Sequence, residues 1–133
     1  PLQLSFGLGV GAGKLGFPWV PLPGIRVGYQ VMEQVNLVAE IEANYLDNRV
    51  SMGAHWTLVA RSTWSPYLLT NVVYGHIGPG GYNRMGASVG AGANASYPKG
   101  FTFHVEVSTT LGGVIDESFY YQLRSTVGVG HRF

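Results

Sequence analysis

Ionisable side chains are rare in this chain of 133 residues, of which 11 % are charged. A typical soluble domain has about a quarter of its residues charged. If the fold buries residues of opposite sign together, they should pair, because an unpaired buried charge is costly. Such a network can be a static core, or it can act as a gate or a proton-responsive plug. The candidate members are Arg26, Glu40, Glu42, His55, Glu106 and Arg124.

Catalysis would need a nucleophile and a base within reach of each other. The segment "FHVEVS" places His104, Glu106 and Ser108 at alternate positions, whereas Ser125 is too far along the chain to bond His131. The four histidines follow no metal-binding spacing, and the absence of cysteine excludes disulfides, thiolate ligands and thiolate nucleophiles. We therefore expect no catalytic residue, no metal and no cofactor. The net charge of +1 gives no reason to expect nucleic acid as a partner.

Alternation of apolar with small or polar side chains organises almost the whole chain. In positions 2–11, for example, Leu4, Phe6 and Leu8 share one parity, and small or polar residues occupy the other. Successive side chains of a strand point to opposite faces, so this pattern predicts a strand with one apolar face. The pattern recurs in eight segments, at 2–11, 25–31, 37–45, 50–60, 68–74, 87–97, 101–111 and 121–133.

The other parity holds every charged residue that we place in a strand, together with most strand glycines. If that face met water, it would be a poor solubilising surface, which argues against a soluble ligand-binding barrel. The interior of an eight-stranded barrel is just wide enough for side chains to fill, and glycines would leave room there for long ones. The apolar face then meets lipid, where Arg or Lys at mid-depth would cost about 2–4 kcal/mol. The charged strand residues are Arg26, Glu40, Glu42, Arg61, Glu106, Arg124 and Arg132.

These patterns predict an all-β fold, a closed eight-stranded antiparallel up-and-down transmembrane β-barrel that forms one domain over residues 1–133. Closure is needed because an open sheet edge would leave backbone groups unpaired in hydrocarbon. An even strand count puts both termini on one side, which is periplasmic in this class. The segments "GKLGFPWVPLPG", "LDNR", "HIGPGGYN" and "GGVIDES" are predicted outer loops, and "MEQV", "RSTWSP" and "YPKG" close the other end. No signal peptide is visible at Pro1, as expected of a mature or trimmed chain.

Counting from the predicted turns gives an expected register for the polar residues. From the turn at 32–35, Arg26 should lie opposite Glu40 or Glu42. From the turn at 46–49, His55 should lie opposite one of the same pair. In the last hairpin, Glu106 should be diagonal to Arg124.

The end of the chain, "STVGVGHRF", has a terminal aromatic residue after alternating apolar ones. In this it resembles the small bacterial outer-membrane barrels, the group that includes the OmpA transmembrane domain and OmpX-like proteins. The resemblance covers the whole chain through its pattern. It implies a location in the outer membrane and recognition by the barrel-assembly machinery, with Val127, Val129 and Phe133 as the assembly signal. His131 departs from the pattern, since that position is more usually apolar or aromatic.

The first outer loop is the most unusual surface of the sequence, because Phe17, Trp19, Val20 and Leu22 stand among three prolines. Prolines stiffen a loop and reduce the ordering cost of binding, and exposed aromatic groups can mark a protein contact. The alternative is that these residues belong to an aromatic girdle at the membrane surface.

The function that we expect is non-enzymatic, with a structural or recognition role as an outer-membrane barrel, as a subunit or accessory of a larger envelope assembly. Its partners would be outer-membrane lipid and a protein bound at the first outer loop. A narrow, weakly conducting pore is the alternative. Some barrels of the resembled group modify lipid A as hydrolases or acyltransferases. Such an enzymatic activity is a third hypothesis, although a lipid A deacylase would need its His and Ser to face lipid on one strand.

Overall fold

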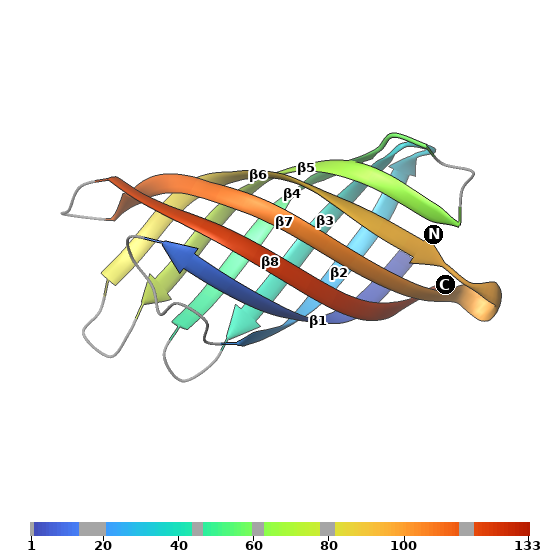
Figure 1. Cartoon of the computed structure of the whole chain (residues 1–133), viewed down its shortest axis with the longest axis horizontal. Helices are drawn as coiled ribbons and strands as arrows, with labels where there is room; N and C mark the ends of the chain where they lie inside the picture. Colours follow the sequence, from blue (N-terminus) through green and yellow to red (C-terminus); the bar gives the residue numbers. More distant parts are fainter. Residues whose placement is uncertain (1, 14–20, 44–46, 60–62, 78–81, 115–118) are drawn as a thin grey trace.

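Eight antiparallel strands form one closed sheet in the computed structural model (Figure 1). Residues 2–13, 21–43, 47–59, 63–77, 82–114 and 119–133 are described. A single 3-10 turn, η1 (Pro98–Gly100), joins β6 to β7. The strands are β1 (Leu2–Gly13), β2 (Leu22–Met32), β3 (Val35–Ala43), β4 (Asp47–Thr57), β5 (Trp64–Ile77), β6 (Tyr82–Ser96), β7 (Phe101–Val114) and β8 (Phe119–Arg132).

Each strand pairs with its neighbours in sequence, and β1 pairs with β8 to close the barrel. The closing register runs from Gln3 opposite Arg132 to Gly13 opposite Gln122. Beyond it, the backbone N–H of Phe133 donates to the carbonyl of Leu2 at 2.8 Å. The two chain ends therefore lie together, at the end of the barrel where η1 lies (Figure 1). The predicted closed, up-and-down topology is confirmed.

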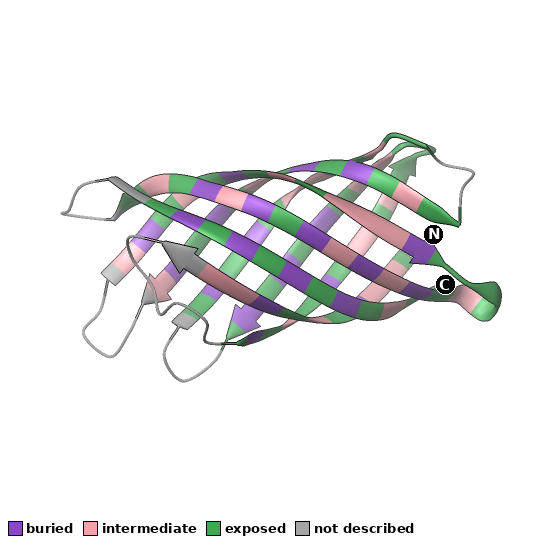
Figure 2. Cartoon of the chain, in the orientation of Figure 1, coloured by how far each residue is buried: buried purple, intermediate pink, exposed green. Residues whose placement is uncertain are grey.

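Burial alternates along the strands, with apolar side chains outside and polar ones inside (Figure 2). On β8, Leu123 is 55 % exposed and Val127 is 48 % exposed, while Arg124 and Thr126 between them are buried. The apolar outward face predicted from the sequence is thus confirmed on the described strands. Ala95 lies on the outward face yet is fully buried, because its cross-strand neighbours Trp64 and Phe103 flank it.

Glycines on the inner face make the space that the interior side chains occupy. A Cβ at Gly9 would lie 2.3 Å from a guanidinium nitrogen of Arg124. A Cβ at Gly128 would lie 2.3 Å from the ring of His104. Because these distances are shorter than any van der Waals contact, a larger residue at either place would displace the side chain opposite.

Several strands reach further toward the outer loops than the turn-like composition predicted. Leu22, expected in the first loop, begins β2 and is buried at 7 % exposure. Arg49, expected in the "LDNR" loop, lies within β4, and Arg84 lies within β6, before its predicted start at 87. Gly, Asn and Asp mark turns by conformational preference, but the same residues also suit the polar inner face of a strand. Among the described residues, no helix is long and apolar enough to cross a membrane.

Candidate functional site

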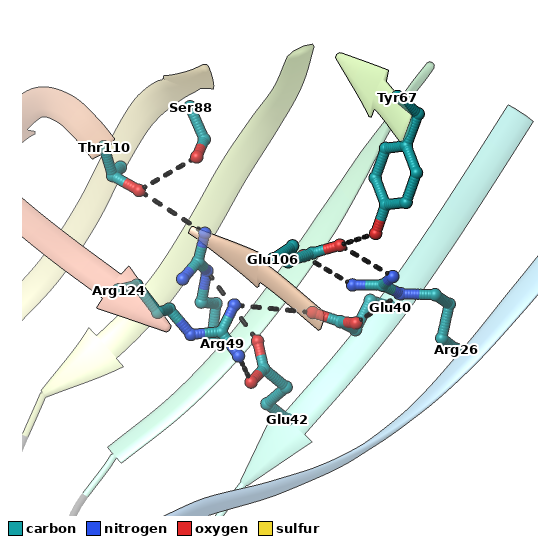
Figure 3. Close-up of polar contacts among 9 residues, drawn as sticks. All are labelled: Arg26, Glu40, Glu42, Arg49, Tyr67, Ser88, Glu106, Thr110 and Arg124. Carbon is teal, nitrogen blue, oxygen red and sulfur yellow. Dashed lines mark hydrogen bonds and ion pairs between the residues drawn. The ribbon is translucent and has the colours of Figure 1, made fainter. Parts of the chain in front are cut away.

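Arg26 on β2 is the centre of a buried polar cluster that draws on four strands (Figure 3). Its Nε donates to Oε2 of Glu40 on β3 at 2.6 Å. Its two terminal nitrogens donate to both carboxylate oxygens of Glu106 on β7, at 2.9 and 2.7 Å. The hydroxyl of Tyr67 on β5 donates to Glu106 Oε2 at 2.6 Å. A two-pronged arginine–carboxylate contact fixes both orientation and distance, so this cluster ties opposite walls of the barrel together.

A second cluster lies beside the first and shares Glu40 with it. Arg124 on β8 forms an ion pair with Glu42 and a longer one with Glu40, Nη1 to Oε1 at 3.5 Å. Nε of Arg49 lies 3.9 Å from Oε1 of Glu42, and its Nη2 donates to Thr110 Oγ1 at 3.4 Å. Glu40 therefore connects two arginines, Arg26 and Arg124, across the interior (Figure 3).

The register explains which predicted partners meet. Arg26 lies opposite Glu40, as expected. Glu106 lies opposite Thr126 and is diagonal to Arg124, also as expected, but its carboxylate pairs with Arg26. The prediction for His55 was wrong, because it lies opposite Asn36. Ala43 pairs with Asn48, so the β3–β4 pairing is centred two residues earlier in the chain than a turn at 46–49 implies, and this shift moves His55 past both glutamates.

His55 instead stacks on the ring of Tyr67, with centroids 4.8 Å apart and planes 10° from parallel. Four members of the buried polar interior are absent from the network predicted from the sequence. Arg49 falls inside a predicted loop, whereas Tyr67 and Arg84 fall between a predicted turn and the strand predicted after it. The parity rule places all three on the inner face once the strands are extended. His104 had the correct parity and was considered only as a catalytic residue. The residues left out are Arg49, Tyr67, Arg84 and His104.

The two clusters hold charge in a packed interior. Among the described residues, four arginines and three glutamates are buried, at Arg26, Arg49, Arg84, Arg124, Glu40, Glu42 and Glu106. Each buried ion loses hydration that its partner only partly restores, so removing one member of a buried ion pair is costly. Within the described part of the chain, no group of three or more His, Asp or Glu could hold a metal ion. The arrangement suits a rigid, charge-filled plug.

A cavity of about 260 Å³ lies on the side of the plug toward the chain ends. Its lining is mostly polar and includes Gln3, Asn36, His55, Asn94 and Arg132. Arg26 and Tyr67, both members of the first cluster, also line it. The lumen thus has a polar pocket at one end that reaches the ion-paired layer.

No family model matches the chain, and a search of curated proteins finds no match. Among the solved structures that resemble it, two do so along nearly their whole length. Neisserial surface protein A is 16 % identical, with a TM-score of 0.62, over 99 % of this chain and 96 % of that one. Ail, the attachment invasion locus protein of Yersinia pestis, is 12 % identical, with a TM-score of 0.52, over 99 % and 96 %. The chain has the fold of the small eight-stranded outer-membrane barrels. At these identities the likeness establishes the fold of the barrel and not its role.

The other predicted site residues belong to the assembly signal and to the predicted partner loop. Val127, Val129 and Phe133, the predicted assembly signal, are all exposed at the outward face or end of β8. Phe17, Trp19 and Val20 of the predicted partner loop fall outside the described residues. Because Leu22 is buried at the start of β2, it does not belong to an exposed apolar group of that loop.

Proposed function

We propose that this chain is an outer-membrane barrel with both termini in the periplasm and a non-enzymatic, structural or recognition role. The observation that carries the proposal is the inverted distribution of polarity. Large apolar side chains such as Phe6, Ile41 and Val89 are exposed, while seven charged residues are buried. A soluble protein rarely exposes a continuous apolar surface of this extent, whereas a lipid-facing wall requires one.

A surface role agrees with the names of the two similar proteins. One is called a surface protein and the other an attachment invasion locus protein. Because both identities are below 20 %, the role reaches this chain only as part of the proposal. Recognition would involve the loops remote from the termini, and biogenesis would depend on the barrel-assembly machinery reading Val127, Val129 and Phe133.

The positions of the histidines and serines support a non-enzymatic role. His104 and Ser108 are buried in the lumen and do not face lipid. The outward-facing His131 uses its Nε2 to bond the carbonyl of Lys99 at 2.9 Å. A lipid-modifying enzyme would need an outward nucleophile and base together. Mass spectrometry of lipid A from cells that express the chain should show no change in acylation, and a new acylation pattern would contradict this part of the proposal.

The experiment for the main proposal separates membranes of expressing cells and isolates the barrel in mild detergent. We expect the chain in the outer-membrane fraction, with a heat-modifiable mobility typical of a closed barrel, and a co-purifying envelope protein if it acts in recognition. Recovery as a soluble protein without detergent would overturn the proposal.

A narrow pore is the second candidate, and the polar cavity of about 260 Å³ favours it. Beyond the cavity, an ion-paired layer crosses the interior, formed by Arg26, Glu106, Glu40 and Arg124. We therefore expect planar bilayers with the unmodified barrel to show no large steady conductance. Conductance that appears only in Glu106→Ala or Arg124→Ala would identify the layer as a plug, while large conductance of the unmodified barrel would favour the pore.

A further inference from the structure

The turn between β6 and β7 holds a lysine in an unusual backbone conformation. Lys99 has φ 68° and ψ 18°, and it is the only non-glycine residue with positive φ in the described part of the chain. L-residues with a side chain rarely adopt this left-handed region, and Asn and Gly do so more readily. The geometry of the turn alone therefore does not account for lysine at this position, and residues held in such conformations often serve a function.

Contacts from β8 fix this turn to the barrel wall. The carbonyl of Lys99 can only accept, so Nε2 of His131 carries the proton and donates to it at 2.9 Å. The ring of His131 also packs where a Cβ at Gly100 would stand, 2.9 Å away. Gly100 itself has φ 83°, which suits glycine. His131, the residue that departs from the usual terminal pattern, thus positions the lysine.

The surroundings of this lysine are positive. Lys99 and His131 are exposed. Arg132, which follows His131 in the sequence, lines the polar cavity. Among the side chains that the structure describes, the exposed carboxylate is Glu33, in the β2–β3 turn. That turn lies four strands away in a closed ring of eight, on the opposite side of the barrel. No described side-chain carboxylate therefore lies beside Lys99.

Aromatic side chains surround the turn on the outward face. Tyr97 and Phe101, on either side of η1, are exposed, and Phe133 packs against His131 with ring centroids 4.7 Å apart. Figure 1 shows the turn beside the chain ends. Aromatic belts lie at the level of lipid headgroups, because their rings are apolar and their edges tolerate water. A lysine within such a belt faces headgroups rather than acyl chains.

We propose that Lys99, positioned by His131, binds the phosphate of an anionic phospholipid such as phosphatidylglycerol at the terminus end of the barrel. This inference rests on the proposed membrane location. The lysine ammonium supplies the charge, and the aromatic side chains of Tyr97, Phe101 and Phe133 flank the glycerol and upper acyl region. A zwitterionic headgroup brings its own cation to the site and is bound less well.

Native mass spectrometry of the full chain, released from micelles with equal phosphatidylglycerol and phosphatidylethanolamine, tests this by identifying the first bound lipid. Lys99→Asn removes the charge and retains a residue that adopts the left-handed turn. The preference for phosphatidylglycerol should fall about fivefold, the ratio that corresponds to the stabilisation of one lysine at an anionic surface. The matched control is Lys14→Asn, which removes the same charge from the β1–β2 connection and should leave the preference unchanged.

Two further arms complete the test. His131→Phe keeps an outward ring but removes the donor to Lys99, so it should weaken the preference, and full retention would overturn the positioning role. Inorganic phosphate at constant ionic strength should not reduce the preference, since competition by it would indicate a site for the free anion. An inserted barrel that binds both lipids equally refutes the headgroup site alone. A chain that does not insert into vesicles refutes the proposed membrane location.

Discussion

The bidentate contact between Arg26 and Glu106 links β2 to β7 across the interior. Arg26→Met would leave Glu40 and Glu106 without their shared cation, and breaking a buried pair on one side costs about 3–5 kcal/mol. Urea unfolding in micelles should therefore show a large loss of stability. In the double variant with Glu106→Gln, the loss should be smaller than the sum of the single losses, because the second change removes a carboxylate that the first left unpaired.

Glu33→Gln is the control for this cycle, since Glu33 is an exposed carboxylate in a turn. Its effect should stay within about 0.5 kcal/mol. If the losses from Arg26→Met and Glu106→Gln simply add, within about 0.5 kcal/mol, the two residues do not act as a pair.

Strand β7 offers a matched pair of glycines on opposite faces. A Cβ at Gly112 would lie 2.2 Å from the carbonyl oxygen of Met85, whereas a Cβ at Gly113 would meet nothing within 4 Å. Gly112→Ala should therefore destabilise the barrel by about 1–3 kcal/mol, as overpacking does. Gly113→Ala should be close to neutral in the same unfolding measurement. Equal effects would mean that glycine on the inner face does not provide the space for close packing.

The first outer loop remains a predicted binding element. A stiff loop with Phe17 and Trp19 can bury aromatic area at low entropic cost, and such anchors contribute about 2 kcal/mol or more each. Replacing both with Ser should leave heat-modifiable folding intact and abolish co-purification of a partner. Loss of folding would instead assign them to the membrane girdle, and unchanged co-purification would move the contact elsewhere.

At the level of strands, the sequence predicts which face of a strand a side chain occupies better than it predicts where the strand begins and ends. The parity of Arg26, Glu40 and Glu106 follows from alternation alone, because a strand has only two faces. The inclusion of Arg49 in a strand and the register of His55 depend on where along the chain each hairpin is centred. The residues there, such as Asn48, suit a turn and a polar strand end equally well. Which carboxylate pairs with which arginine depends on side chains crossing the lumen, a contact that hairpin register does not encode.

For the whole molecule, closure of the sheet, the apolar outer wall and the polar interior depend on one another. Closing β1 against β8 pairs the edge strands, which hydrocarbon demands. An eight-stranded barrel has an interior that side chains can fill. Here paired charged side chains occupy it, and inner-face glycines leave room for them. A change that empties the ion-paired layer therefore affects both stability and permeability.

Site-directed nitroxide labelling in reconstituted vesicles tests the central claim most directly, and the absence of cysteine makes each introduced label unique. Labels at Val89, Val107 and Leu111, which are exposed on the wall, should be reached by oxygen dissolved in lipid and not by a water-soluble nickel chelate. A label at the buried Ser108 should show no lipid contact. Access of the nickel chelate to the three wall positions, with lipid contact at Ser108, would contradict the account of a lipid-facing barrel.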